Sequence, residues 1–284
     1  MERATALLDV PPGERLVVST DASVEYIHFR RDWLTPKEIG WRATTAALSD
    51  LAAMGATPLG VLTALAVPET WRDALSDIGE GIADAVAAVG TKIVGGDMSA
   101  SNDLTIAVTV LGSVKAPLER RGARAGDSLW VTGTLGGPAA ALRSWLAGDA
   151  PSTASRERFV HPRARIEEGK WLATNGATAA IDISDGLIAD ARHIAAASGV
   201  AITIALNTIP LFAGSTTADA AAGGEEYELL VAAPPSLDAR AFTARFSLPL
   251  TRVGEIAAAP PTGVTVTMGG ASVEFSGGYD HFVR

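Results

Sequence analysis

The sequence contains no cysteine, which excludes disulfides, a catalytic thiolate and zinc sites built on thiolate ligands. It has only 4 histidines in 284 residues, and none lies in a setting typical of a catalytic triad. It also lacks an excess of positive charge: the formal net charge is -9, which argues against general binding to nucleic acids or membrane surfaces. An acidic protein can still bind phosphate groups through metal ions, provided that its carboxylates are clustered.

No hydrophobic run is long enough to predict a transmembrane helix. The longest uncharged apolar stretch, residues 51–67, contains Gly55, Pro58 and Gly60 and is shorter than a membrane span. The first residues, MERAT, lack the basic and then apolar layout of a signal peptide. The chain is 48% hydrophobic and 19% charged, so we expect a folded protein that acts in the cytoplasm.

Helical and strand patterns alternate along the chain and predict two domains of α/β or α+β type. The segment TPKE at 35–38 has the spacing of a capping box and predicts a helix that Gly55 can end. Apolar and β-branched runs predict strands at 16–20, 91–96, 128–132, 200–206 and 228–232, with several short strands after 251. The stretch 115–126, rich in Arg, Pro and Gly, predicts the boundary between domains at 1–115 and 116–284.

Aspartates follow or interrupt three of the predicted strands, in VVSTD (Asp21), KIVGGD (Asp97) and AIDISD (Asp182 and Asp185). A buried carboxylate without a partner costs several kcal/mol, so each needs a cation, a helix cap or water. Asp185 alone is typical of an N-cap, and Asp50 on the first predicted helix is equally consistent with a solvated side chain. Asp182 lies inside the apolar run, where a cap is excluded. The set predicts Mg²⁺, which prefers oxygen ligands.

Glycine pairs at the ends of predicted elements, such as Gly95-Gly96 and Gly136-Gly137, are typical of turns or of backbone that approaches a ligand. The sequence has neither a P-loop motif nor a dinucleotide-binding fingerprint after its first strand. A bound phosphate would therefore be held by metal, backbone and arginine.

Eight segments spread over nearly the whole chain form a specific order: STDASVEYIHF (19–29), ALSDLAAMGATP (47–58), KIVGGD (92–97), GDSLWVTGTLG (126–136), HPRARIEEG (161–169), AIDISDGLIAD (180–190), GGEEYELL (223–230) and SGGYDHF (276–282). Together they resemble the thiamine-monophosphate kinase family, whose superfamily includes aminoimidazole ribonucleotide synthetase and selenophosphate synthetase.

The resemblance implies an α+β fold of α/β-like character, the two-domain aminoimidazole-ribonucleotide-synthetase-like fold. It also implies a homodimer whose N-terminal, ATP-binding domains pair as a β-barrel, followed by a C-terminal α/β domain. The implied reaction transfers the γ-phosphoryl group of ATP to thiamine monophosphate with the help of several Mg²⁺ ions. The acceptor oxygen is already ionised at neutral pH, so the reaction requires alignment and charge neutralisation rather than a general base.

The resemblance also implies a set of site residues. The Mg²⁺ ligands would be Thr20, Asp21, Asp50, Asp97, Asp182, Ser184 and Asp185, with Asp97, Asp182 and Asp185 as the catalytic carboxylates. ATP would lie against Gly95, Gly96, Asp97, Gly133, Arg143 and Ser184. The thiamine pocket would be lined by His28, Glu225 and Tyr279. A structural, hydrogen-bonded His28 and a merely packed Tyr279 are the alternatives.

The chain departs from the family pattern at its start, where Glu2, Arg3 and Ala4 occupy the positions of a Gly-Asp-Asp segment. Either the chain begins too late or its metal site lacks these carboxylates. In addition, Glu226 stands where Asp is usual, and Tyr279 where Trp is frequent. Two further hypotheses therefore stay open: a relative that uses ATP on another small substrate, and a catalytically silent dimer that binds ATP or thiamine phosphates.

Overall fold

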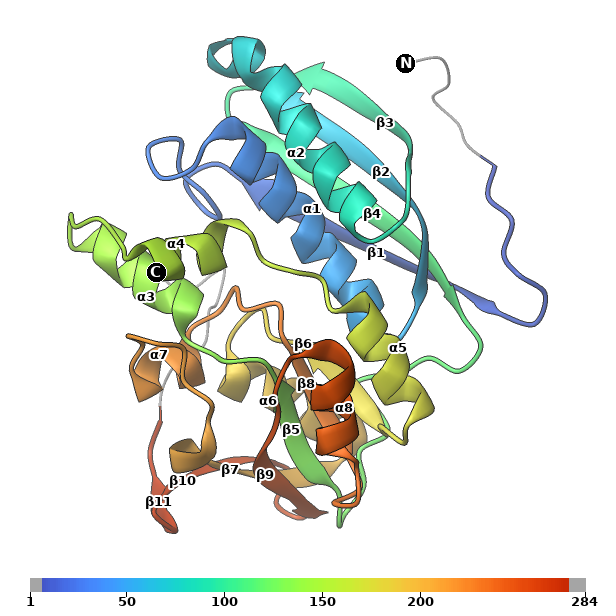
Figure 1. Cartoon of the computed structure of the whole chain (residues 1–284), viewed down its shortest axis with the longest axis vertical. Helices are drawn as coiled ribbons and strands as arrows, with labels where there is room; N and C mark the ends of the chain where they lie inside the picture. Colours follow the sequence, from blue (N-terminus) through green and yellow to red (C-terminus); the bar gives the residue numbers. More distant parts are fainter. Residues whose placement is uncertain (1–6, 276–284) are drawn as a thin grey trace.

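Two β-sheets built from separate stretches of chain organise the two domains of the molecule (Figure 1). The computed structural model describes residues 7–275. The first sheet has four strands in the order β1-β4-β2-β3, and the second has seven in the order β11-β10-β7-β9-β5-β8-β6. The strands of the first sheet are β1 (Arg15–Val24), β2 (Thr57–Val67), β3 (Ile93–Ala100) and β4 (Thr105–Val114).

Two helices, α1 (Pro36–Ala53) and α2 (Leu75–Ala88), pack on one face of the first sheet, and the 3-10 turn η1 (Glu69–Ala74) leads into α2 (Figure 1). The sheet pairs β4 antiparallel with β1 and β2, whereas β2 and β3 are parallel. Val108 and Val110 of β4 are fully buried under the helices, and Thr109 between them faces the opposite side. The sheet therefore has one covered and one open face.

Helix α1 is buried on most of its surface because it lies between the first sheet and the second domain. It contacts β1 and β4 on one side and α5 and β6 on the other. The predicted capping box is confirmed: the Thr35 hydroxyl accepts the Glu38 N–H at 3.3 Å, and the Glu38 carboxylate accepts the Thr35 N–H at 2.8 Å. A Cβ on Gly40 would overlap the Ile78 carbonyl oxygen, so glycine at this position allows α1 and α2 to pack closely.

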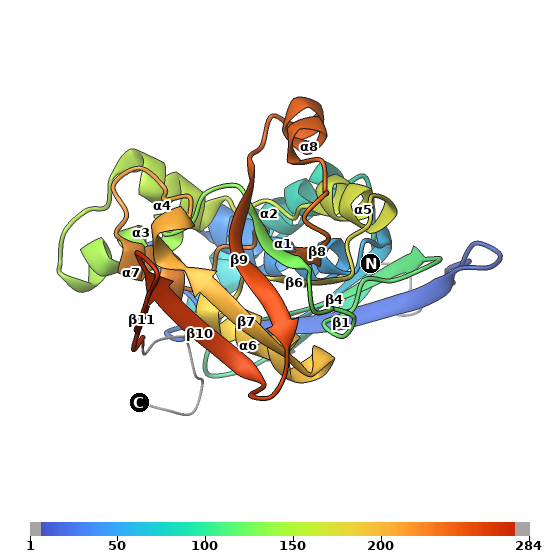
Figure 2. The same ribbon diagram turned by 90° about the horizontal axis from the view of Figure 1, so that it is seen from below.

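The second sheet carries the remaining elements, and Figure 2 shows β10, β7 and β9 side by side. Its strands are β5 (Ser128–Thr132), β6 (Ala179–Asp182), β7 (Val200–Ala205), β8 (Leu229–Ala233), β9 (Leu250–Ala258), β10 (Gly263–Met268) and β11 (Ala271–Val273). The helical elements are α3 (Gly137–Leu146), α4 (Thr153–Val160), α5 (Ile166–Thr174), α6 (Leu187–Ser198), η2 (Leu206–Thr208), α7 (Thr217–Ala222) and α8 (Ala239–Phe246). None of the helices described between residues 7 and 275 is both long and apolar enough to cross a lipid bilayer.

Strand β6 lies at an edge of this sheet, and its side chains alternate between two hydrophobic cores. Ala179 and Ile181 pack in the core that contains α6, whereas Ala180 packs in the core shared with α1. Because alternate residues share a face, the side chain of Asp182 is directed toward α1. The alternation thus brings a carboxylate of the second domain to a helix of the first.

Two predicted strands extend past the aspartates that were expected to end them. Asp21 pairs with Val108 and β1 continues to Val24, while Asp97 pairs with Ala64 and β3 continues to Ala100. The prediction of a strand tip is wrong at these two positions, because ladder pairing satisfies the backbone and an exposed strand tolerates polar side chains. The third strand, β6, is present but ends at Asp182, which was expected inside the run, and Asp185 follows in the loop.

Candidate functional site

A cleft of about 620 Å³ lies where β1, α1, α3 and the loops after β6 and before β8 meet. Both domains contribute to its wall. The predicted site residues that line it are Asp21, His28, Asp50, Arg143, Asp182, Ser184, Asp185 and Glu225. The fold therefore gathers eight residues that are spread over more than two hundred positions in the sequence.

Three carboxylates converge because α1 is packed between the two sheets. Asp21 pairs with the buried Val108, so the pleat directs its side chain to the helix side of the first sheet. Asp50 lies in the last turns of α1 and accepts a hydrogen bond from the Ser19 hydroxyl, two residues before Asp21 on the same face. Asp182 approaches from the other sheet. The three oxygen ligands thus come from three different elements.

The electrostatics of this meeting point are dominated by negative charge. Asp182 is 5% exposed. Burial in the first place, and then the carboxylates of Asp50, Asp190 and Asp21, raise the pKa of Asp182 well above its ordinary value. Such a group is costly when ionised, and a divalent cation would relieve that cost.

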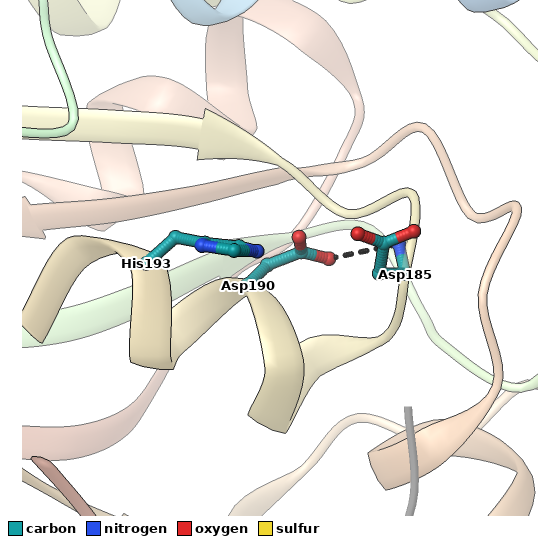
Figure 3. Close-up of side chains that lie close together, drawn as sticks. All are labelled: Asp185, Asp190 and His193. Atoms are coloured by element: carbon teal, nitrogen blue, oxygen red, sulfur yellow. Dashed lines mark hydrogen bonds between the residues drawn. The ribbon is translucent and has the colours of Figure 1, made fainter. Parts of the chain in front are cut away.

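The loop after β6 is held by Asp190 rather than capped by Asp185. The helix begins after Gly186, which makes no side-chain cap, and one oxygen of Asp190 accepts the backbone N–H groups of Ser184, Asp185 and Gly186, each at 3.1 Å. Figure 3 shows the bond from Asp185. Burial, and next the charge of Asp185, raise the pKa of Asp190 to about 7, against the effect of these bonds. Asp185 is therefore not needed as a cap, and its side chain lines the cleft.

Asp185, Asp190 and His193 also form an acidic cluster, with one ligand atom of each residue within 4.8 Å of the others. Figure 3 shows Asp190 between the other two side chains. Because one Asp190 oxygen is committed to three backbone N–H groups, we interpret this cluster as the support of the loop.

The loop before β8 reaches the cleft by lying against the loop after β6. The Glu225 N–H donates to the Ser184 carbonyl oxygen at 2.7 Å. A Cβ on Gly224 would overlap the same carbonyl oxygen, so this close approach requires glycine. Glu225 itself has a φ of 67°, a left-handed conformation that is uncommon outside glycine and is concentrated at functional sites.

His28 lies in the loop that follows β1. Its Nδ1 accepts the Val24 N–H at 3.1 Å, so a neutral His28 ring carries its proton on Nε2. The ring is thus a hydrogen-bonded histidine that also lines the cleft, and the two interpretations of His28 are compatible.

Other predicted residues lie elsewhere in this chain. The Thr20 hydroxyl meets that of Thr109 at 3.0 Å on the open face of the first sheet. Asp97 is exposed and shares that open face through its pairing with Ala64, and Gly95 and Gly96 precede it on the edge strand β3. Gly133 lies against the Glu228 carboxylate. The positions of Glu2, Arg3, Ala4 and Tyr279 lie outside the described residues.

Three arginines in the cleft wall, Arg30, Arg42 and Arg120, were missed by the sequence reasoning. Arg120 belongs to the segment between β4 and β5, where arginine was taken only as part of a domain boundary. Arg42 lies on α1 and is 4% exposed. A charged residue among the apolar and small residues of a helix is a signal of a buried partner, and that signal was available for Arg42.

The residues present fit a hard divalent cation. Asp21, Asp50, Asp182 and Asp185 offer carboxylate oxygens and Ser184 a hydroxyl, all in the wall of one cleft. Oxygen ligands are the preference of Mg²⁺. Arg143 also lines the cleft and forms a paired hydrogen bond with Asp219, at 3.2 and 2.8 Å, which fixes its guanidinium group at the mouth.

Comparison with known proteins gives two family models in sequence order. Residues 2–114 match the AIR synthase related protein, N-terminal domain, and residues 124–267 match the AIR synthase related protein, C-terminal domain. The chain is 38% identical to the thiamine-monophosphate kinase of Mycobacterium tuberculosis over 224 residues, which cover 78% of this chain and 67% of the relative. It is 32% identical to that of Haemophilus influenzae, covering 98% of this chain and 89% of the relative.

Solved structures agree with these matches. The thiamine-monophosphate kinase of Stenotrophomonas maltophilia K279a superposes with a TM-score of 0.84 at 35% identity, covering 92% of this chain and 87% of that one. The structure of AaThiL complexed with AMPPCP and TMP superposes with a TM-score of 0.83 at 32% identity, covering 98% of this chain and 90% of that one.

Proposed function

We propose that this chain, which belongs to the thiamine-monophosphate kinase family, transfers the γ-phosphoryl group of ATP to thiamine monophosphate and so forms thiamine diphosphate. The observation that carries the proposal is the convergence of Asp21, Asp50, Asp182 and Asp185 in one cleft. The complex of AaThiL with AMPPCP and TMP supports the choice of both substrates, because that relative covers nearly the whole chain. We expect the reaction to take place in the cytoplasm.

The work of the protein in this reaction is to align two phosphates and to neutralise their charge. The attacking phosphate oxygen is ionised at neutral pH, so no side chain has to remove a proton. Asp182 and Asp185 would stand beside the reacting groups, and Arg120 and Arg143 would offer positive charge at the wall of the same cleft. His28 and Glu225 would contact the acceptor.

The carboxylates of Asp21, Asp50, Asp182 and Asp185, with the Ser184 hydroxyl, would hold Mg²⁺. Bound Mg²⁺ supplies neutralisation of the polyphosphate charge. The protein contributes a partly preformed set of oxygen ligands, of which Asp182 is buried, and this lowers the cost of assembling the site when the cation enters.

We also propose a homodimer formed through the open face of the first sheet, with domains at 1–115 for ATP binding and dimerisation and at 116–284 for the C-terminal part. Leu16 and Val18 of β1 are 50% and 56% exposed on this face, which supports burial against a second copy. Pairing of two such faces is the β-barrel arrangement that the family resemblance implies. In that arrangement Thr20, Gly95, Gly96 and Asp97 would act near the interface, and Gly133 would remain a backbone contact of the nucleotide.

The direct test is to incubate the protein with ATP, Mg²⁺ and thiamine monophosphate and to measure thiamine diphosphate. We expect product from the wild type and none above background from Asp182→Asn. ATP consumption that depends on a different acceptor would replace this proposal by a related enzyme of the superfamily. Binding of ATP and thiamine monophosphate without turnover would support a silent homologue.

A further inference from the structure

Arg42 joins the two domains at the wall of the cleft. Its guanidinium group donates to Oε2 of Glu225 and to the carbonyl oxygen of Phe159, and it stacks over the Phe159 ring at 3.7 Å from the centroid. The Tyr227 hydroxyl donates to the same Glu225 oxygen at 2.7 Å. Helix α1 of the first domain thus holds a carboxylate on the loop that precedes β8 of the second.

The two oxygens of this carboxylate have different surroundings. Oε2 of Glu225 is shared by Arg42 and Tyr227, whereas the side chain as a whole is 31% exposed and lines the cleft. A carboxylate that is anchored through one oxygen can present the other in a fixed direction. Such an oxygen accepts a hydrogen bond from an N–H donor of a ligand with little loss of side-chain entropy.

The backbone around Glu225 is held in an uncommon conformation. Glu225 and Tyr227 have φ values of 67° and 53°, and each is a strained conformation for a residue other than glycine. The N–H groups of Glu225 and Tyr227 donate to Ser184 and Ile183 carbonyl oxygens at 2.7 and 2.9 Å. The Arg42 ion pair therefore acts on a loop that is strained and directly bonded to the segment of Ser184.

A second arginine at the same domain contact gives a natural comparison. Arg156 of α4 makes a paired hydrogen bond with Glu38 of α1, at 2.7 and 2.8 Å. Both arginines connect α1 to the second domain through a carboxylate, but the lining of the cleft includes Arg42 and Glu225 and neither Arg156 nor Glu38. If the Arg42 pair were purely structural, the two pairs would behave alike.

We propose that Arg42 is a positioning residue that fixes Glu225, so that the second carboxylate oxygen, Oε1, accepts a hydrogen bond from an N–H group of the acceptor substrate. The inference rests on the proposed function and deepens it. It assigns to Arg42 an effect on the acceptor and not on ATP. Tyr227 supports the same carboxylate with a single neutral hydrogen bond, so its contribution is smaller.

The test compares four variants in steady-state kinetics and thermal unfolding. Arg42→Met and Arg42→Lys remove the fork of donors, with the charge removed in the first and kept in the second. We expect KM for thiamine monophosphate to rise about tenfold or more, which is the factor for about 1.4 kcal/mol, while KM for ATP changes less than twofold. Tyr227→Phe should raise KM for the acceptor about two- to threefold. Arg156→Met should lower the Tm without changing either KM.

Equal changes of KM in Arg42→Met and Arg156→Met would overturn the inference, as would an unchanged KM for the acceptor in a folded Arg42 variant. A wild-type chain without turnover contradicts the proposed function instead, and calorimetry of thiamine monophosphate binding then decides about Arg42. The inference is overturned if Arg42→Lys binds thiamine monophosphate as tightly as the wild type does. It is also overturned if the wild type does not bind thiamine monophosphate.

Discussion

Two groups of buried acids in this molecule have pKa values that are shifted in opposite directions. Glu228, 1% exposed, is surrounded by Arg158, Arg165 and the Thr132 hydroxyl, with distances of 2.5 to 2.9 Å. Burial acts to raise the pKa of Glu228, but the charges of Arg165 and Arg158 outweigh it and the pKa is lowered. Asp182 is buried to a similar degree among other carboxylates, and its pKa is raised.

The opposite pKa shifts indicate different roles for the Glu228 cluster and the Asp182 cluster. The Glu228 cluster has its counter-charges within the chain and ties the segments of α4 and α5 to β8, so it stabilises the second domain. The Asp182 cluster has its like charges at the wall of the cleft, where they disfavour the isolated protein and favour a bound cation. Sites of this kind are expected to reduce stability for the sake of function.

The largest effect should come from breaking the paired cluster. Glu228→Gln leaves Arg158 and Arg165 without their carboxylate, and breaking a buried pair by removing one partner costs about 3–5 kcal/mol. The measurement is the free energy of unfolding in urea. Glu255→Gln, which removes an exposed pair with Arg252, serves as the control and should change it by less than about 1 kcal/mol. Equal losses in the two variants would show that the cluster does not stabilise the domain.

A smaller effect on stability is expected from Glu226, a neighbour of the paired cluster whose pKa is shifted in the opposite direction from that of Glu228. Burial, which exceeds the opposing effect of Arg158 and the Gly136 N–H, raises the pKa of Glu226 from 4.5 to about 8. The folded protein therefore retains this proton when the unfolded chain has lost it, and stability falls as the pH rises from 4.5 and stops falling above 8. The shift of the Glu226 pKa alone should lower the free energy of unfolding by about 2 kcal/mol between pH 6 and pH 8.

Glu226→Gln should remove that part of the pH dependence, measured as the free energy of unfolding at pH 6 and pH 8. The matched control is Glu255→Gln, which changes an exposed carboxylate and should leave the difference in stability between pH 6 and pH 8 in place. A wild type with equal stability at both pH values would contradict the assignment.

The smallest change in stability is expected at Asp190. Asp190→Ala removes the acceptor of three backbone N–H groups but also removes a buried acid, and the two effects partly cancel to about 1 kcal/mol. The loop that carries Ser184 and Asp185 would lose its support, so we expect Mn²⁺ affinity to fall about tenfold. Asp190→Asn keeps an oxygen acceptor and should retain most of that affinity. Equal Mn²⁺ affinity in the alanine variant would exclude a supporting role.

The elements with local signals could be predicted from the sequence. The capping box of α1, the presence of the strand that carries Asp182 and the cluster-forming aspartates have such signals. The helices α4, α7 and α8 span 6 to 8 residues and were not predicted, because so short a helix has too few turns for a periodic pattern.

The rest of the site depended on register and on contacts between distant segments. The open-face position of Asp97 follows from its pairing with Ala64, which no local pattern encodes. Arg42 meets a partner 183 positions away, and Asp190 replaces the expected cap at Asp185 from within the helix. These features arise only when the two sheets pack around α1.

The most direct measurement of the central claim is the stability of Asp182→Asn at pH 8.5, with EDTA and with Mn²⁺. The account predicts a variant that is more stable than the wild type in EDTA, because the cost of burying this acid among other carboxylates is gone, and whose Tm no longer rises when Mn²⁺ is added. A variant that is less stable in EDTA, or that keeps the full rise with Mn²⁺, would contradict the claim that these carboxylates form one cation site.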